Sequence, residues 1–428
     1  MPAALPSSPD VVIIGAGAAG LGAARKLMKS GHSVLIVEAA SRVGGRAWTQ
    51  SDSFGVPIDM GCSWISGARK NRFAKIARKS GFTLVDHTDR GTALFIDGRR
   101  ASEAELAAYE KAGRKVEQAM AKAGKKDRDV PASDVIPIGL PFLGAAKAWM
   151  GPMDYGVDWD GISALDDYLS ANDQPSYIVA EGLGAVVATL AEGLPIALGT
   201  AVRAVDWSGQ GVVIETDRGT IRARACLVTV STGVLASGAI RFTPDLPAAK
   251  QQAIHDLPMG LLVKVPLLFD GARLGLKDNE WMSYDIPDEA STRACFFITW
   301  PFGQDYVFGN IGGRFGWDIS REGPEATVDF ALDELVRQVG SDARKHFIKG
   351  IATEWASDPL TLGAYAALRP GRHGARNVLA EPMAGRVFFA GEAMGGNCSA
   401  LVNGALESGR KAARAIRDAL GGRVKLDR

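Results

Sequence analysis

Hydrophobic residues near the amino terminus change their spacing twice within thirty residues. Residues 10–15, DVVIIG, form a short apolar run that is typical of a buried strand, and residues 18–30 have the Ala, Leu and Lys content of a helix. Residues 33–38, SVLIVE, form a second apolar run. A strand, a helix and another strand in this order predict a βαβ unit with parallel strands, and therefore an α/β domain.

The same periodicities predict further elements along the chain. Residues 196–230 are expected to form several strands, with a turn at TDRGT (216–220). Helical patterns occupy residues 101–126, 325–340 and 403–422, and the last of them ends at two glycines. The many charged residues of 101–126 predict a solvated helix face. No internal repeat or low-complexity segment is visible.

One lysine interrupts the apolar run PMGLLVKVPLLF, residues 258–269. Strand alternation places Leu262, Lys264 and Pro266 on one face. A buried lysine must find a partner or give up its proton, because isolated burial of a charge is costly. This window alone allows two interpretations: an edge strand with its lysine in water, or a buried lysine with a function.

Length and composition narrow the class of protein. The chain has 428 residues, enough for two domains, and its 46% hydrophobic and 23% charged residues are ordinary for a globular enzyme. Its 49 basic and 48 acidic residues leave a formal net charge of +1. This balance favours neither nucleic acid nor an anionic membrane as a partner.

The cysteines are too scattered to suggest a metal site or a disulfide framework. They are Cys62, Cys226, Cys295 and Cys398, and no CxxC or Cys/His cluster is present. The amino terminus lacks the basic and apolar regions of a secretory signal. The longest uncharged stretch, 225–240, is too short to span a membrane. A cytoplasmic protein without bound metal is expected.

The sequence GAGAAG follows the first predicted strand and opens the first helix. Gly15 permits a tight turn, Gly17 lets the backbone approach a pyrophosphate, and Gly20 lets the helix pack closely on the strand. Glu38 ends the second strand, where an acidic residue accepts hydrogen bonds from ribose hydroxyls. The predicted phosphate-binding residues are Gly15, Gly17, Ala18, Ala19 and Gly20. This motif predicts a dinucleotide site for either NAD or FAD.

Residues 38–49, EAASRVGGRAWT, continue directly from this unit. Their Gly44, Gly45 and Arg46 resemble the second glycine motif of glutathione-reductase-type FAD enzymes, specifically of the flavin amine oxidase family. The resemblance implies that the two glycines allow close approach to the flavin side and that the arginine lies near the pyrophosphate. FAD is therefore the expected cofactor.

The far end of the chain carries a second part of this resemblance. GRVFFAGEAM (385–394) and NGALESGRKAARAI (403–416) are similar to the carboxy-terminal FAD motif of the family. The resemblance implies that a strand ends at Gly391 and that Glu392 lies next to the ribityl–pyrophosphate. The other cofactor contacts expected from it are Ala39, Val202, Ala400 and Leu401.

Residues 226–269 also resemble the family, and the resemblance gives the lysine a role. Relatives carry one lysine on this strand that holds a water against flavin N5, so Lys264 is expected in the active site. Tyr365 falls where the family places an aromatic ring that orients the amine, although core packing is the alternative. Ala364 stands where monoamine oxidases have the cysteine that tethers flavin, which implies non-covalent FAD.

The sequence departs from the family pattern on the substrate side. Leu401 stands where the second aromatic residue of the amine cage usually lies. GCSWISGARKN (61–71) resembles the substrate entrance of polyamine oxidases, but Ser66 replaces the usual histidine. Trp64, Ser66 and Leu401 are the candidate substrate residues, and the identity of the amine stays open.

Charge is distributed unevenly in the middle of the chain. Residues 148–202 contain eight acidic residues and no Lys or Arg. They predict either an entrance that attracts a cationic amine or a solvated acidic face. The preceding apolar segment, 135–150, is expected to cap the substrate cavity or to form a packed helix.

The resemblance covers residues 10–420 and implies an α/β fold with two domains. A Rossmann-like FAD-binding domain of the glutathione-reductase type would comprise 9–80, 185–265 and 375–422. An inserted α+β substrate-binding domain would comprise 81–184 and 266–374.

The activity implied by the resemblance is oxidative deamination of a primary or secondary amine, with polyamines among the candidates. Hydride transfer to flavin N5 would give an imine and then an aldehyde, and dioxygen would reoxidise the flavin to give hydrogen peroxide. One alternative is an L-amino-acid oxidase, with Arg314 or Arg369 as the carboxylate clamp. Others are a flavin desaturase, which the composition disfavours, and a non-catalytic FAD-binding protein. A monomer and a homodimer are both compatible with the sequence.

Overall fold

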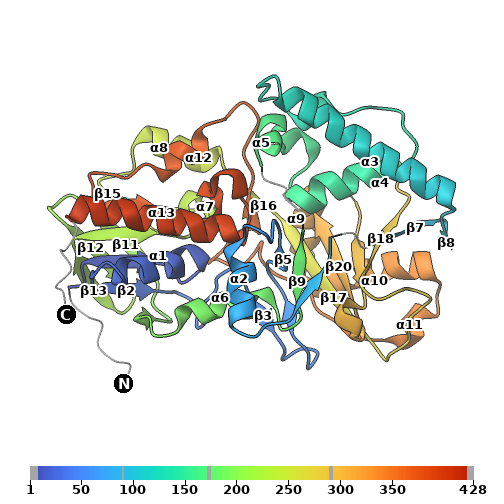
Figure 1. The fold of residues 1–428 in the computed structure, drawn as a ribbon, viewed down its shortest axis with the longest axis horizontal. Helices are drawn as coiled ribbons and strands as arrows, with labels where there is room; N and C mark the ends of the chain where they lie inside the picture. The colour runs from blue at the N-terminus through green and yellow to red at the C-terminus, as the bar shows by residue number, and fades with distance from the viewer. Residues whose placement is uncertain (1–7, 89–90, 171–174, 289–292, 422–428) are drawn as a thin grey trace.

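The computed structural model describes residues 8–88, 91–170, 175–288 and 293–421. Two parts of the molecule lie next to each other along its longest axis (Figure 1). One is built on a five-stranded sheet, and the other on a seven-stranded sheet. This arrangement agrees with the predicted α/β fold and its inserted α+β part.

The first βαβ unit forms where the apolar pattern predicts it. Strand β1 (Val11–Ile14), helix α1 (Ala18–Met28) and strand β2 (Val34–Val37) follow one another, and every residue of the two strands is buried. All strands of this sheet are parallel, so their carboxyl ends meet at one edge. In order across the sheet they are β10 (Ile196–Ala197), β2, β1, β14 (Ala225–Val228) and β23 (Val387–Phe389).

Different layers cover the two faces of the five-stranded sheet. Helix α1 and helix α13 (Val402–Leu420) pack together on one face (Figure 1). A four-stranded sheet shares a hydrophobic core with the other face. Its strands, in order, are β13 (Gly219–Ala223), β12 (Val212–Thr216), β11 (Val202–Asp206) and β15 (Arg241–Thr243). Helices α7 (Thr232–Ala236), α8 (Ala248–His255) and α12 (Ala375–Ala380) lie at the same side. The strands and the TDRGT turn predicted for this region are confirmed.

The seven-stranded sheet is mixed, with one parallel pair among antiparallel neighbours. In order, its strands are β21 (Phe347–Gly350), β17 (Leu262–Phe269), β20 (Tyr306–Gly312), β19 (Phe296–Thr299), β18 (Glu280–Tyr284), β7 (Thr92–Ile96) and β8 (Arg99–Arg100). Strand β17 crosses the predicted domain limit at residue 265, yet it pairs within this sheet along its length. The domain limits themselves stay a prediction.

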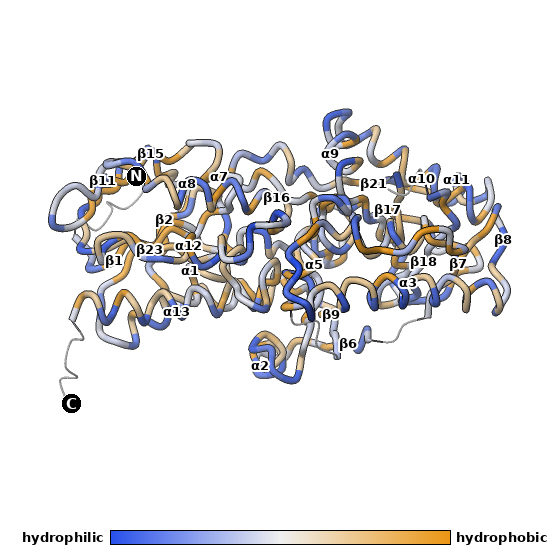
Figure 2. Tube along the Cα trace, turned by 90° about the horizontal axis from the view of Figure 1, so that it is seen from above, coloured by the Kyte–Doolittle hydropathy of each residue, from blue (hydrophilic) through white to orange (hydrophobic). Residues whose placement is uncertain are grey.

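Helices flank this second sheet. Ser102 and Glu105 form a capping box at the start of α3 (Glu103–Gly124), which explains why the charged segment begins its helix there. Hydrophilic and hydrophobic residues alternate along α3 (Figure 2), and its charged side chains face solvent as predicted. The other helices include α9 (Gly313–Arg321), α10 (Pro324–Val339) and α11 (Ala343–His346). No helix in the described ranges combines the length and apolarity that crossing a membrane requires.

Short strands occupy the junction of the two parts. Strand β16 (Met259–Gly260) pairs with β22 (Tyr365–Ala366), and β16 leads directly into β17. This pairing brings the predicted catalytic lysine and tyrosine to the same region of the fold. The remaining small sheets contain β3 (Thr49–Gln50), β4 (Ile58–Asp59), β5 (Trp64–Ile65), β6 (Leu84–Asp86) and β9 (Tyr177–Val179).

Candidate active site

A cavity of about 910 Å³ contains nearly every predicted site residue in its wall. The glycine motif after β1, the second glycine motif and the carboxy-terminal motif line it together with β17 and β22. Of the predicted cofactor, catalytic and substrate residues, only Gly20 is absent from this wall. Segments far apart in sequence thus form one site, although the role of each residue stays a prediction.

Gly20 instead contributes to the packing beneath the cavity. A Cβ at this position would overlap the carbonyl oxygen of Gly15, so only glycine lets α1 approach the strand this closely. Gly15 itself has a φ of +107°, which favours glycine. No side chain caps the amino terminus of α1. Its first backbone N–H groups are therefore left to bind an anion.

Glu38 and the second glycine motif complete this cradle. The Glu38 carboxylate accepts hydrogen bonds from Ala16 N at 2.7 Å and Ala40 N at 2.8 Å, which hold it at the end of β2. Its oxygens retain further acceptor capacity for ribose hydroxyls. Gly17 and Gly44 form a β-bridge, and Gly44 N donates to Ala16 O at 2.9 Å. Two backbone segments without side chains therefore meet where a pyrophosphate would lie, which fits an adenine dinucleotide.

An ion pair joins the motifs from opposite ends of the chain. Arg46 Nη1 lies 2.8 Å from Glu392 Oε1 and donates to Ala364 O at 2.9 Å. Glu392 also accepts from Ala366 N at 3.3 Å. Arg42, which the sequence did not single out, donates to Gly45 O at 2.7 Å and lines the same wall. This side of the cavity presents guanidinium groups, which favour the binding of an anion such as a pyrophosphate.

Lys264 lies inside the protein, so the edge-strand interpretation is wrong. Its residue is only 3% exposed, and Asn310 of β20 faces it across the sheet. On the opposite edge of β17, Thr353 covers the backbone, and Lys264 N donates a hydrogen bond to Thr353 Oγ1 at 2.9 Å. The ammonium group donates to Asp59 O at 3.2 Å, to Ser63 Oγ at 2.5 Å and to Gly61 O.

The surroundings of Lys264 change its ionisation. Burial lowers its pKa to about 8, and electrostatic interactions with Asp59 and Cys62 oppose this shift only in part. Burial also raises the pKa of Asp59 and brings that of Cys62 to about 12. The lowered lysine pKa agrees with the expectation for an active-site lysine.

Aromatic side chains form the wall near Lys264. The Tyr365 hydroxyl donates to Met153 O at 3.1 Å, which holds the ring at the cavity. Trp64 stacks on Trp281 with ring centroids 5.6 Å apart, and Trp149 meets Trp281 edge-on at 4.5 Å. The sequence indicated Tyr365 and Trp64, and Trp149 lies within the predicted capping segment 135–150, although no motif singled it out. Trp281 belongs to no segment that the sequence singled out.

The predicted capping segment is only partly a packed helix. Helix α4 (Leu143–Ala148) passes into a π-helical turn, η2 (Trp149–Met153), that contains Pro152. Trp149 and Met153 of this turn line the cavity. Ile138, earlier in the segment, is instead 88% exposed.

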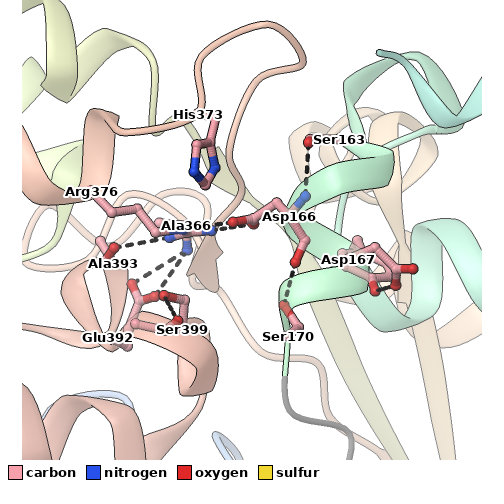
Figure 3. A network of polar contacts seen from close by, with 12 residues as sticks. Ser163, Asp166, Asp167, Ser170, Ala366, His373, Arg376, Glu392, Ala393 and Ser399 are labelled. Carbon is pink, nitrogen blue, oxygen red and sulfur yellow. Dashed lines mark hydrogen bonds and ion pairs between the residues drawn. The ribbon is translucent and has the colours of Figure 1, made fainter. Parts of the chain in front are cut away.

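The acidic stretch 148–202 divides between the cavity and the surface. Asp154, Asp166 and Asp167 line the cavity. Figure 3 shows Asp166 of α5 (Ala164–Leu169) directed toward Arg376, and their side chains form an ion pair at 2.7 Å. Asp167 points away from that arginine (Figure 3) and accepts a hydrogen bond from the Tyr155 hydroxyl. In contrast, Asp158 and Asp160 pair with an exposed arginine, Arg314.

The sequence matches the protein family described as "Flavin containing amine oxidoreductase" over residues 18–134 and 160–417. It is 32% identical to "Lysine-specific histone demethylase 1 homolog 1" of Oryza sativa subsp. japonica, with 100% of this chain and 54% of that protein aligned. It is 29% identical to "Polyamine oxidase 4" of the same organism, covering 95% of this chain and 88% of that protein. The chain thus spans about half the length of the demethylase homologue.

Solved structures show the same fold. Wild-type putrescine oxidase bound to putrescine superposes with a TM-score of 0.79 at 20% sequence identity, covering 96% of this chain and 99% of that one. Together with the glycine cradle and the Arg46–Glu392 pair, these similarities confirm the resemblance inferred from the motifs. The chain belongs to the flavin-containing amine oxidoreductase family.

Proposed function

We propose that this protein binds FAD non-covalently and oxidises a small primary or secondary amine, with dioxygen as the electron acceptor. The main support for this proposal is the position of Lys264, because its buried ammonium group lies in the same cavity as the dinucleotide cradle and an aromatic wall. FAD bound in this cradle would supply the hydride acceptor that converts the amine to an imine, with dioxygen reduced to hydrogen peroxide on reoxidation. Water would then hydrolyse the imine to an aldehyde, releasing ammonia from a primary amine or a smaller amine from a secondary one.

Residues of this chain would bind the cofactor, move protons and orient the substrate. The α1 amino terminus, Gly17 and Gly44 would bind the pyrophosphate, and Glu38 the ribose. Lys264 would hold a water molecule and move protons at the flavin ring. The aromatic wall would orient the unprotonated amine and exclude bulk water from it. Ala364 supplies no thiol where monoamine oxidases tether their cofactor, which supports non-covalent binding.

Two observations favour a small amine over other substrates. Polyamine oxidases are among the relatives, and the putrescine oxidase structure of the same fold holds putrescine. An L-amino-acid oxidase would need a free arginine at the substrate. Arg314 and Arg369 are both absent from the described cavity wall, and Arg314 is already paired at the surface.

The first test is anaerobic reduction of the purified flavoprotein, followed by the absorbance near 450 nm. The panel contains spermine, spermidine, putrescine, a benzylic amine, a cyclic amine and several L-amino acids. Rapid bleaching by an amine, with peroxide formed when air is admitted, is the expected result. Bleaching by amino acids alone would favour the carboxylate-clamping alternative, and a flavin that no compound reduces would refute the proposal as stated.

A further inference from the structure

Asp154 is a carboxylate of the cavity wall that none of the described side chains pairs with. It directly follows the π-helical turn η2 and lines the cavity. Tyr365 donates its hydroxyl hydrogen to the carbonyl of Met153, the residue before Asp154. This contact fixes the Asp154 backbone beside the aromatic wall of the candidate active site. Asp154 itself has no hydrogen-bond or ion-pair partner within the described residues.

The other carboxylates of the described cavity wall already have hydrogen-bond or ion-pair partners. Asp166 is paired with Arg376, and Asp167 accepts the Tyr155 hydroxyl hydrogen. On the cofactor side, Arg46 is paired with Glu392. None of these contacts extends to Asp154, so its carboxylate remains available to a ligand in the cavity.

The electrostatic surroundings of Asp154 are unfavourable for an isolated anion. The surrounding protein limits hydration in the cavity, and Asp167 and Glu117 add negative charge. These effects raise the pKa of Asp154 to about 7. No cation in the described part of the chain offsets them. A cationic ligand group beside Asp154 would supply the missing positive charge.

We infer that Asp154 binds a second ammonium group of the substrate, so that the site selects diamines or polyamines over monoamines. This inference rests on the proposed amine oxidation and specifies its substrate class. The nitrogen to be oxidised lies unprotonated at the aromatic wall near Lys264, while the distal nitrogen remains an ammonium and forms an ion pair with Asp154. Asp154 therefore contributes to substrate selection without taking part in bond breaking.

The test compares 1,4-diaminobutane with n-butylamine, which has the same carbon chain and one nitrogen fewer. In the wild-type holoenzyme, kcat/KM should be higher for the diamine. Asp154→Asn keeps the size of the side chain but removes its charge, and it should raise KM for the diamine by about 10- to 100-fold. For n-butylamine KM should change by less than about twofold, because that amine has no second charge. Asp154→Glu, which restores a carboxylate, should recover part of the diamine preference.

Asp160→Asn is the matched control, because Asp160 belongs to the same acidic segment but pairs with Arg314 at the surface. It should leave both KM values unchanged. Equal effects of Asp154→Asn on the two amines, or a wild-type preference for n-butylamine, would overturn the inference while leaving amine oxidation intact. If Asp154→Asn fails to fold, Asp154→Glu still tests the residue, and the wild-type comparison still tests the preference for diamines. A wild-type protein that oxidises neither amine, nor any other amine of the wider panel, would refute the proposed function itself.

Discussion

Replacing Lys264 by methionine separates its chemical role from its contribution to stability. Methionine preserves most of the side-chain length but removes the ammonium group that donates to Asp59 O, Gly61 O and Ser63 Oγ. If Lys264 serves the flavin, Lys264→Met should slow flavin reduction or reoxidation by at least about tenfold while FAD stays bound. The protein should nevertheless remain folded.

The structure indicates why the loss of stability should be limited. The pKa of Lys264 falls from 10.5 to about 8 on folding. This shift means that the charged ammonium is about 3 kcal/mol less favourable in the folded state than in the unfolded state at neutral pH. The substitution removes this cost but leaves buried oxygens without their donor, at about 1–3 kcal/mol each. The three oxygens together would cost about 3–9 kcal/mol, and the opposing effect reduces this, so we expect the free energy of unfolding to fall by about 0–6 kcal/mol.

The same pKa shift predicts a pH dependence with a definite sign. Between pH 8 and pH 10.5 the unfolded chain holds a proton on Lys264 that the folded chain has released. Wild-type stability should therefore rise with pH across this window relative to Lys264→Met, by about 3 kcal/mol in total. Urea unfolding at several pH values measures this difference, and a wild-type curve that falls relative to the variant would refute the burial argument.

Lys250 provides the matched control for the kinetics. It is also buried, and its ammonium donates to three carbonyls, those of Val378, Leu379 and Glu381, at the end of α12, outside the cavity. Lys250→Met should destabilise the protein but leave both flavin half-reactions unchanged in stopped-flow measurements. Equal kinetic effects of the two substitutions, or unchanged kinetics in Lys264→Met, would refute a specific role for Lys264.

Three further predictions address the cofactor and the substrate. Gly20→Val should weaken FAD binding by at least about 100-fold, because the valine side chain would displace α1 from Gly15. Gly209→Ala, whose new methyl group would lie in open space, should leave FAD binding unchanged. Flavin fluorescence titration measures FAD binding in both variants. Acid precipitation should release all flavin into the supernatant, since Ala364 offers no thiol, and a yellow pellet would contradict non-covalent binding. Because the Asp154 pKa is about 7, KM for a diamine relative to a monoamine should fall as pH rises through 7, and this trend should be absent in Asp154→Asn.

The cofactor half of the site could be predicted from sequence because its chemistry is local. Gly15 and Gly17 lie between a strand and a helix, Gly20 lies in the first turn of that helix, and Glu38 directly follows the next strand. Backbone geometry requires these residue types at these spacings. Lys264 was ambiguous from its own window, since a strand pattern does not reveal whether another segment covers its edge.

The substrate half depends on contacts that no local pattern encodes. The ammonium of Lys264 is held largely by backbone carbonyls of Asp59 and Gly61, which any sequence would supply. Trp149 reaches the cavity through the π-helical turn that follows α4, and the apolar pattern alone left a cavity cap and a packed helix both open for this segment. Composition could identify an acidic stretch, but only the fold separates Asp154 in the cavity from Asp160 at the surface.

The near-neutral net charge of the chain conceals a separation of charge within this one cavity. Arg42 and Arg46 line the side of the glycine motifs, where an anionic pyrophosphate would bind. Asp154 and Asp167 line another part of the wall, and the first of them has no compensating cation among the described residues. Such a division allows a doubly negative cofactor linkage and a cationic substrate to occupy one cavity, because each meets charges of the opposite sign. Lys264, with its lowered pKa, lies in the same cavity and can change its protonation at modest cost, as a group that moves protons must.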